Sequence, residues 1–317
     1  MSNLWIISDI VETAYEMLAK ARELVSDSGG SVTAFLNGSE AQAQEAISYG
    51  ADLVKLMQIP EKTPWEEYVP VLVQEAQGQK PDIILVGATR RGKDLAAQLA
   101  AHLDCPCVTE CKTIQYGGTK ALLKRMVYGG LAEKTVECNE FPLIATVAGR
   151  TFSKWEVNDT ARQGIVSTLA LPDKLKVKVV ERRPKPKETV NIKDAPLVVG
   201  VGRGFSEASD VKLAEELAQA MGGEVGCSRP IAEDLHWLPE DRYIGISGQV
   251  IKPEVYLAAG ISGQVQHVYG IRDAKTIVVV DKNENAPIFQ VADYYIVGDL
   301  KEVLPALTKA AQEAKGS

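Results

Sequence analysis

Ile244–His267 reads IGISGQVIKPEVYLAAGISGQVQH and contains the hexapeptide GISGQV twice. The copies begin at Gly245 and Gly260, 15 residues apart. Stacked solenoid repeats have periods of about 20 to 50 residues, so these copies are too close together to be repeats of that kind. The second copy directly follows Val255–Ala259, a run typical of a buried strand. We therefore expect an α/β domain in which the two copies form adjacent loops that face one ligand.

The sequence on either side of this stretch also alternates between strand-like and helix-like runs. Pro196–Gly202 is typical of a buried strand, and the run after it predicts a helix that is capped by Ser206 or Ser209 and ends at Gly222–Gly223. Further strands are expected at Tyr243–Ile246, Val255–Ala259, Lys275–Asp281 and Asp293–Val297, and a terminal helix at Asp299–Ala314. These elements predict a doubly wound domain.

The first half of the chain predicts a second parallel sheet. Buried strands are expected at Leu4–Ser8, Ser31–Leu36, Ala51–Met57 and Pro81–Gly87, and helices at Ala14–Asp27, Glu40–Gly50, Pro64–Gln77 and Gly92–Leu103. The βα alternation implies a parallel sheet with helices on both faces. Three later stretches, KALLKRMVYGG, KTVECNE and FPLIATVAG, predict an antiparallel appendage before Arg150.

The length of 317 residues favours two domains. Residues 181–195 read ERRPKPKETVNIKDA, with two prolines, five basic residues and no apolar periodicity. This predicts a linker between an N-terminal domain, 1–180, and a C-terminal domain, 196–317. A solvated connector is the favoured interpretation of its charges, and contact with a phosphate or an acidic partner is the alternative.

Composition excludes several classes of protein. With 45% hydrophobic and 24% charged residues, the chain is typical of a globular protein. Its net charge of −7 argues against nucleic acid as a partner, because binding phosphates requires a basic face. No apolar run approaches the roughly 20 residues of a membrane span. The start, MSNLWIISDI, has no features of an export or import signal, so we expect a cytoplasmic protein.

The five cysteines predict reduced thiols, since their number is odd and no export signal precedes them. His102, Cys105, Cys107 and Cys111 lie close together in sequence, and such ligands suit zinc. Their spacing is not that of a standard finger or ribbon. We therefore predict no metal site, and a strand in which the cysteines act as small buried hydrophobic residues.

Two glycine-rich segments lie where a strand meets a helix, Gly200–Ser206 (GVGRGFS) and Ala258–His267. Glycine allows close backbone approach, and a helix start offers unpaired N–H groups to a phosphate. GVGRGFS is not a complete GxGxxG motif, and a tight turn is the alternative. Two such segments and the first GISGQV copy in one domain favour a nucleotide cofactor at the C-terminal ends of the strands.

The second half resembles the α subunit of electron-transfer flavoproteins. The resemblance rests on GRG (Gly202–Gly204), SR (Ser228–Arg229), the double GISGQV stretch and KTIVVVDKNENAPIFQVADYYIVGDL (Lys275–Leu300). GISGxxQH and APIFxxADY are specific to that family. The first half is similar in pattern only: ATRRGKDLAAQLA falls at the family's equivalent loop, and Cys111 falls where the family often has a cysteine.

The resemblance implies an α/β heterodimer with one FAD, held mainly by the C-terminal domain of α. It also implies a nucleotide-α-hydrolase-like N-terminal domain and a Rossmann-like C-terminal domain. The residues at the family's flavin-contacting positions are Arg203, Ser228, Arg229, Ile244, Gly245, Ile246, Ser247, Ser262, Gly263, Gln264, Val265, Gln266, His267, Asp281, Asp299 and Leu300.

Three of these residues are expected to tune the flavin. Arg229 matches a permanent cation over the ring, which favours its negatively charged reduced form. Ser247 matches a hydroxyl at the flavin N5 edge, and His267 a donor near the N1–C2 carbonyl region. The second GISGQV loop would start the helix that meets the pyrophosphate.

The chain departs from the commonest family pattern at two places. Ile246–Ser247 stands where the family usually has Gln-Thr, so a side-chain amide near the flavin is lost. Asp281 stands where the family has Asn near the adenosine end. These changes fit a specialised bacterial member better than the generic fatty-acid-oxidation protein.

The resemblance predicts an electron carrier that exchanges electrons with an acyl-CoA dehydrogenase-type flavoenzyme, and not an enzyme with its own substrate. No nucleophile–base pair or paired carboxylates occur in the C-terminal motifs, which fits a flavin that carries the chemistry. One alternative is the α subunit of an electron-bifurcating, NADH-oxidising complex, with two FAD per heterodimer. Another is an NAD- or CoA-binding α/β protein without flavin.

Overall fold

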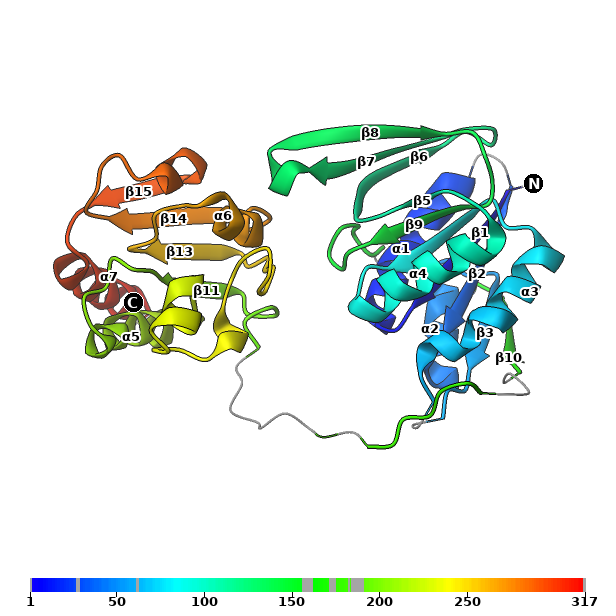
Figure 1. Cartoon of the computed structure of the whole chain (residues 1–317), viewed down its shortest axis with the longest axis horizontal. Coiled ribbons are helices and arrows are strands. Elements are labelled where there is room, and N and C mark those ends of the chain that lie inside the picture. Colours follow the sequence, from blue (N-terminus) through cyan, green and yellow to red (C-terminus); the bar gives the residue numbers. More distant parts are fainter. Residues whose placement is uncertain are drawn as a thin grey trace. The chain divides into compact units, whose positions relative to one another are not determined.

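The computed structural model of the protein describes residues 2–26, 29–60, 63–155, 162–170, 175–181, 183 and 191–315. The chain forms two compact units, Met1–Arg183 and Pro184–Ser317, each with its own parallel sheet (Figure 1). The division falls within the expected linker 181–195, of which residues 182 and 184–190 lie outside the described residues.

Seven parallel strands form the main sheet of the first unit, in the order β10-β3-β2-β1-β4-β9-β5. The strands are β1 (Asn3–Ser8), β2 (Ser31–Leu36), β3 (Leu53–Met57), β4 (Ile83–Gly87), β5 (Cys107–Val108), β9 (Leu143–Val147) and β10 (Ile165–Leu169). The helices are α1 (Val11–Val25), α2 (Glu40–Ser48), α3 (Val69–Gln79) and α4 (Arg90–Leu103), with short 3-10 helices at Trp65–Tyr68 and Tyr128–Gly130. The predicted alternation of four strands and four helices, from β1 to α4, is confirmed, whereas β10 was not predicted.

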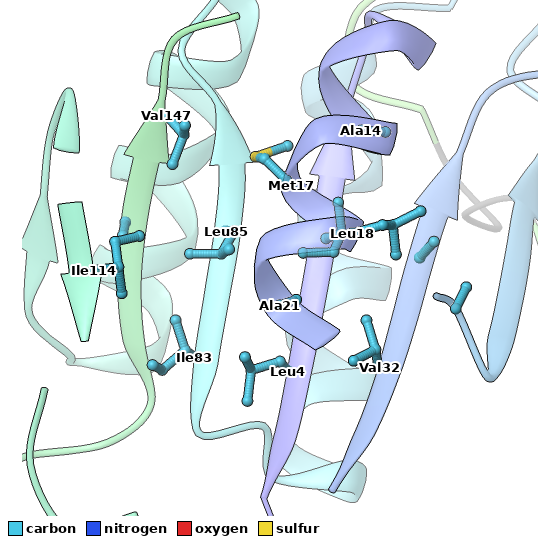
Figure 2. Packing of buried hydrophobic residues seen from close by; sticks show 14 of the residues in the cluster. Leu4, Ala14, Met17, Leu18, Ala21, Val32, Ile83, Leu85, Ile114 and Val147 are labelled. Atoms are coloured by element: carbon cyan, nitrogen blue, oxygen red, sulfur yellow. The ribbon is translucent and has the colours of Figure 1, made fainter. Parts of the chain in front are cut away.

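Both faces of this sheet are buried. On one face, Leu4 and Ile6 of β1 belong to the core formed with α1 and α2; on the other, Trp5 and Ile7 pack with α3 and α4. Figure 2 shows Leu18 of α1 over the sheet, with Leu4 and Val32 beside it. Because a parallel strand is covered on both sides, its sequence is continuously apolar, and this made these strands predictable.

The antiparallel appendage exists, but it is shorter than predicted. It is a three-stranded sheet of β6 (Cys111–Tyr116), β7 (Ala121–Val127) and β8 (Ala132–Cys138). The prediction that FPLIATVAG joins it is wrong, because β9 lies in the main sheet, parallel to β4 and β5. All five residues of β9 are buried, as expected of a strand covered on both faces, whereas β7 and β8 have exposed positions.

The cysteine-rich segment is a broken strand. β5 ends at Val108 and β6 begins at Cys111, and Glu110 between them has a positive φ of 55°. Cys111 is buried as predicted, but Cys107 is exposed and Cys105 is partly exposed. Burial raises the pKa of the Cys111 thiol to about 12. Among the described residues, no group of three or more His, Cys, Asp or Glu side chains is placed to hold a metal ion.

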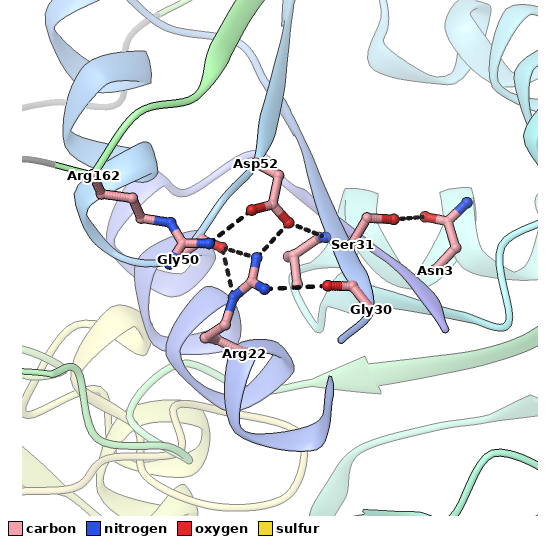
Figure 3. A network of polar contacts seen from close by, with 8 residues as sticks. Asn3, Arg22, Gly30, Ser31, Gly50, Asp52 and Arg162 are labelled. Carbon is pink, nitrogen blue, oxygen red and sulfur yellow. Dashed lines mark hydrogen bonds and ion pairs between the residues drawn. The ribbon is translucent and has the colours of Figure 1, made fainter. Parts of the chain in front are cut away.

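The Asp52 carboxylate, with Arg22 and Arg162, connects helix α1 to the sheet (Figure 3). Asp52 accepts hydrogen bonds from Arg22 at 2.5 Å, from Arg162 at 2.7 Å and from the backbone N–H of Val32 at 2.9 Å. Arg22 also donates to the carbonyl oxygens of Gly50 and Gly30. Partial burial works to raise the pKa of Asp52, but the hydrogen bonds and charges of the arginines hold it below its ordinary value.

Replacing Asp52 with Asn is expected to lower the free energy of unfolding of the first unit by about 1 kcal/mol at pH 7, a figure discounted for its partial exposure. Because the folded pKa lies below the unfolded value of about 3.9, this stabilisation is present at neutral pH and is lost as the pH falls through the folded pKa. Urea unfolding at pH 7 and at pH 3 measures it, with the exposed Asp94→Asn as control. An equal deficit at both pH values would contradict the expected charge effect.

The second unit is a five-stranded parallel sheet in the order β12-β11-β13-β14-β15. Its strands are β11 (Leu197–Val201), β12 (Glu224–Cys227), β13 (Val255–Ala259), β14 (Thr276–Asp281) and β15 (Tyr294–Val297), and its helices are α5 (Val211–Met221), α6 (Val265–Ile271) and α7 (Leu300–Lys315). Single-turn helices cover Ala208–Asp210, Pro230–Asp234, Glu240–Arg242 and Pro287–Val291. Leu217 of α5 and Leu304 of α7 belong to one core cluster and Ile271 of α6 to another, so the predicted doubly wound arrangement is confirmed.

Two local predictions in the second unit are wrong, and one strand was missed. Neither Ser206 nor Ser209 caps the first helix, because a 3-10 turn intervenes and α5 begins at Val211 without a side-chain cap. Tyr243–Ile246 is not a strand and makes only isolated bridges. The short strand β12 was not predicted, since EVGC carries too few apolar residues for a periodic signal. Gly222 does end α5, in the left-handed conformation expected of a C-terminal glycine.

Candidate functional site

The five strands of the second unit end at one edge of the sheet, because all are parallel. The predicted site residues follow their carboxyl ends: Arg203 after β11, Ser228 and Arg229 after β12, Ser262–His267 after β13, Asp281 at the end of β14, and Asp299 and Leu300 after β15. From β11 the chain first adds β12 on one side of the sheet and then crosses over to add β13 on the other side, so the direction in which strands are added reverses between β11 and β13. In open α/β sheets, ligands bind at this edge, next to such a reversal.

The loops after β11 and β13 are in direct backbone contact. The N–H groups of Gly202 and Gly204 donate to the carbonyl oxygens of Ala259, at 3.0 Å, and Gly260, at 2.8 Å. A Cβ added to Gly204 would lie 2.5 Å from the Gly260 Cα. The glycines of GVGRG are therefore needed for contact between the two loops, whereas the sequence suggested that they admit a ligand. Arg203 lies between them and is exposed.

The two GISGQV copies are adjacent, as predicted. The N–H of Ile246 in the first copy donates to the carbonyl oxygen of Gln266, just after the second copy, at 2.9 Å. A Cβ on Gly270 would lie 2.7 Å from the Gly245 nitrogen, so the backbones also touch further along α6. The repeated hexapeptide thus builds two loops that support each other.

The first loop presents a hydroxyl to solvent. Ser247 and Ile246 are exposed, while Ile244 and Gly245 are buried beneath them. The Ser247 Oγ lies 3.0 Å from the Tyr243 hydroxyl, so the side chain is held in one orientation. Tyr243 was not among the predicted site residues, because it lies just before the motif and reads as a strand residue.

The second loop offers unpaired donors. Within the described residues, the backbone N–H groups of Ser262, Gly263 and Gln264 have no protein acceptor. The side chains of Ser262, Gln264, Val265 and Gln266 are exposed around them. Because α6 has only seven residues, its dipole is small, and an anion here would be held by these N–H groups and the exposed polar side chains.

Arg229 is exposed and already paired. Its side chain is 65% exposed, and its Nε lies 2.6 Å from a carboxylate oxygen of Glu233, one turn away. The Glu233 hydrogen bond raises the pKa of Arg229 above its ordinary value. Ser228 is buried and donates its N–H to the Val201 carbonyl, which fixes the start of this loop. Glu233 was not predicted as a site residue, because it belongs to an irregular turn that has no periodic signal in the sequence.

His267 is buried, whereas the resemblance predicted that its imidazole donates a hydrogen bond to the flavin. Its Nε2 lies 2.8 Å from the Tyr256 hydroxyl and its Nδ1 lies 3.1 Å from the Ile244 carbonyl oxygen. Burial lowers the pKa of His267 to about 4. Both ring nitrogens therefore have partners within the protein, and the imidazole is neutral at pH 7. Tyr256 was missed because strand periodicity marks it simply as a core residue.

A small pocket of about 50 Å³ lies where β14 and β15 end. Asp281 and Asp299 line it together with Asp210, Lys301 and the start of α7 at Leu300. Asp281 is buried and accepts a hydrogen bond from the Asn283 N–H at 2.8 Å. Asp299 accepts from the Lys301 N–H at 2.8 Å and so caps α7. Carboxylates beside a pocket at this edge are suited to ribose hydroxyls.

These features fit FAD. The unpaired N–H groups suit a pyrophosphate, the pocket with Asp281 and Asp299 suits an adenosine end, and the exposed Ser247 and Arg229 remain for the flavin ring. All of them belong to one edge of one sheet.

Comparison with known proteins gives the same assignment. Residues 191–272 match the family model "Electron transfer flavoprotein FAD-binding domain", and residues 8–174 match "Electron transfer flavoprotein domain". The chain is 38% identical over 312 residues to Protein FixB of Escherichia coli O7:K1, and 37% identical to Protein FixB of Shigella flexneri. Each alignment covers 98% of both chains. The chain belongs to the electron transfer flavoprotein family, in which it corresponds to the α subunit, and its cofactor is FAD.

Proposed function

We propose that this chain is the FAD-holding α subunit of a heterodimeric electron carrier, and that the flavin lies along the carboxyl edge of the second unit. The observation that supports this most strongly is the convergence of polar side chains and unpaired N–H groups from five strand ends on that edge. The cofactor supplies the redox chemistry when bound, by taking up and releasing electrons at its ring system.

Different residues of the chain would bind different parts of FAD. The N–H groups of Ser262–Gln264 and the side chain of Gln266 would hold the pyrophosphate, and Asp281 and Asp299 the ribose. Arg203 lies next to this loop and would add positive charge. Arg229 would lie against the ring, where its fixed charge stabilises added negative charge.

The proposed partners are an electron transfer flavoprotein β subunit and an acyl-CoA dehydrogenase-type flavoenzyme. Family membership supports the first, since the family's second subunit completes the carrier. The second follows from the need for a donor or acceptor. None of the described helices is long and apolar enough to cross a bilayer. We place the complex in the cytoplasm.

When this chain is produced together with a β subunit, we expect one FAD per copy of this chain, bound at its second unit. The chain produced alone is expected to contain little flavin. The reason is that exposed Ser247, Ile246 and Arg229 leave the ring side of the site open without a partner. The measurement is FAD released per chain after denaturation, with and without the β subunit. A fully flavinated, monodisperse single chain would argue against a shared site, and a flavin-free heterodimer would refute the proposed function.

A further inference from the structure

The ring of Tyr243 fills the inside of the first GISGQV loop. The side chain is buried, and the loop returns to its backbone, where the Gln249 N–H donates to the Tyr243 carbonyl oxygen at 2.7 Å. A Cβ added to Gly248 would lie 2.7 Å from Cδ1 of the ring, and one added to Gly245 would lie 2.9 Å from its hydroxyl oxygen. Both glycines of this copy are therefore needed, because the tyrosine occupies the space that their side chains would take.

The second copy of the hexapeptide is built differently. Gly260 and Gly263 occupy the same places in it, but there an added Cβ would meet the Gly204 Cα at 2.7 Å and the Ile288 nitrogen at 2.3 Å, and neither neighbour is an aromatic ring. The residue that corresponds to Tyr243 is Ala258. The two loops share a sequence, but only the first is folded around a tyrosine.

The surroundings of Tyr243 determine which hydroxyl donates. Among the described residues, the Tyr243 hydroxyl has one hydrogen-bond partner, the Ser247 hydroxyl at 3.0 Å, and either O–H can donate across this contact. Tyr243 is 5% exposed, so its proton is left without an acceptor if it points elsewhere, whereas Ser247 is exposed and can turn its own proton outward. The favoured arrangement is therefore donation from Tyr243 to the Ser247 Oγ, with the serine O–H directed out of the loop.

We infer that Tyr243 is a positioning residue, which holds the Ser247 side chain in one rotamer and presents its hydroxyl as a hydrogen-bond donor to the edge of the flavin ring. Tyr243 acts through Ser247 and not by contact with the cofactor. A donor that is oriented in advance favours a ring nitrogen that carries no proton. The inference rests on the proposed function, which assigns Ser247 to the flavin ring.

The rotamer of Ser247 can be measured without flavin. In the full chain with labelled serine, three-bond couplings across the Cα–Cβ bond report the rotamer, and Ser247→Ala identifies the signal. We expect one rotamer in the wild type and averaged couplings in Tyr243→Phe, which keeps the ring and loses only the hydroxyl. The matched control is Tyr68→Phe, which removes a buried hydroxyl of the first unit that has no partner among the described residues. Averaged couplings in the wild type, or an unchanged rotamer in Tyr243→Phe, would overturn the inference.

A double-mutant cycle in the flavin-binding complex tests whether Tyr243 acts through Ser247. Tyr243→Phe is expected to weaken FAD binding about threefold and Ser247→Ala up to about tenfold, within the range of one hydrogen bond. The double variant should bind FAD as Ser247→Ala does, because the tyrosine has no other route to the cofactor. Losses that multiply in the double variant would show an independent structural effect of Tyr243 and would refute the positioning role.

The N5 resonance of nitrogen-labelled FAD gives a readout that a simple loss of stability does not move. The resonance reports a hydrogen bond donated to that nitrogen, so it should shift in Tyr243→Phe, shift further in Ser247→Ala, and stay at the Ser247→Ala position in the double variant. An N5 resonance that is the same in the wild type and in Tyr243→Phe would contradict the inference. The two failures are distinguishable: a complex that binds no FAD refutes the proposed function, while the Ser247 couplings still decide whether Tyr243 orients the hydroxyl.

Discussion

Replacing Gly263 with Ala is expected to weaken FAD binding on the order of a hundredfold. Gly263 has a φ of +89°, a conformation that costs an L-residue about 1–2 kcal/mol. An added Cβ would also lie 2.3 Å from the backbone nitrogen of Ile288, and relieving such a contact costs about 1–3 kcal/mol. Together these costs are about 2–5 kcal/mol, and since each 1.4 kcal/mol is a factor of ten, a hundredfold loss lies within this range.

The loss should be specific to the cofactor loop. The Ile288 N–H donates to the Ser262 carbonyl at 3.1 Å, so moving the loop away breaks this bond and displaces the unpaired N–H groups. Equilibrium binding of FAD to the refolded complex measures the effect. Gly78→Ala in α3 is the control, because a Cβ there meets no atom within 4 Å. Near wild-type affinity in Gly263→Ala would mean that the cofactor does not use this loop.

Replacing Arg229 with Ala is expected to lower the potential of the flavin's first one-electron reduction, on the order of 60 mV, the equivalent of a tenfold change in the equilibrium constant. The cause is loss of a fixed positive charge beside the ring. Lys should restore part of the effect, because an ammonium keeps the charge but not the planar contact.

Glu233 provides a matched variant of opposite sign. Its carboxylate pairs with Arg229 at 2.6 Å and partly offsets that charge. Glu233→Gln should therefore raise the potential, by less than Arg229→Ala lowers it. Spectroelectrochemical titration of both variants, after FAD occupancy has been checked, measures the two shifts. If the two potentials shift in the same direction, or if neither shifts in fully flavinated protein, Arg229 does not lie against the flavin ring.

The parts of the fold that the sequence predicted are those with a local signal. β1, β4 and β13 are continuous apolar runs because both of their faces are buried, and α5 ends at the glycine that its geometry requires. β9 has the same apolar character, but it follows the three antiparallel strands β6, β7 and β8 in sequence. Only its tertiary pairing with β4 and β5 assigns it to the main sheet.

The site was predictable as a set of segments and not as a set of contacts. Strand order places Arg203, Arg229 and Asp299 at one edge, which motif reading anticipated. The contact of His267 with the Tyr256 hydroxyl was not predictable, because the alternation of Tyr256 in β13 indicates only burial. The role of Glu233 depends on an irregular turn at Pro230–Asp234, for which the sequence has no periodic signal.

A structure of the flavin-bound heterodimer tests the proposed site most directly. The flavin ring should lie against Arg229 and Ser247, the pyrophosphate against the N–H groups of Ser262–Gln264, and the ribose beside Asp281 and Asp299. FAD bound at the first unit instead, or bound at the second unit away from the carboxyl edge of β11 and β13, would contradict it.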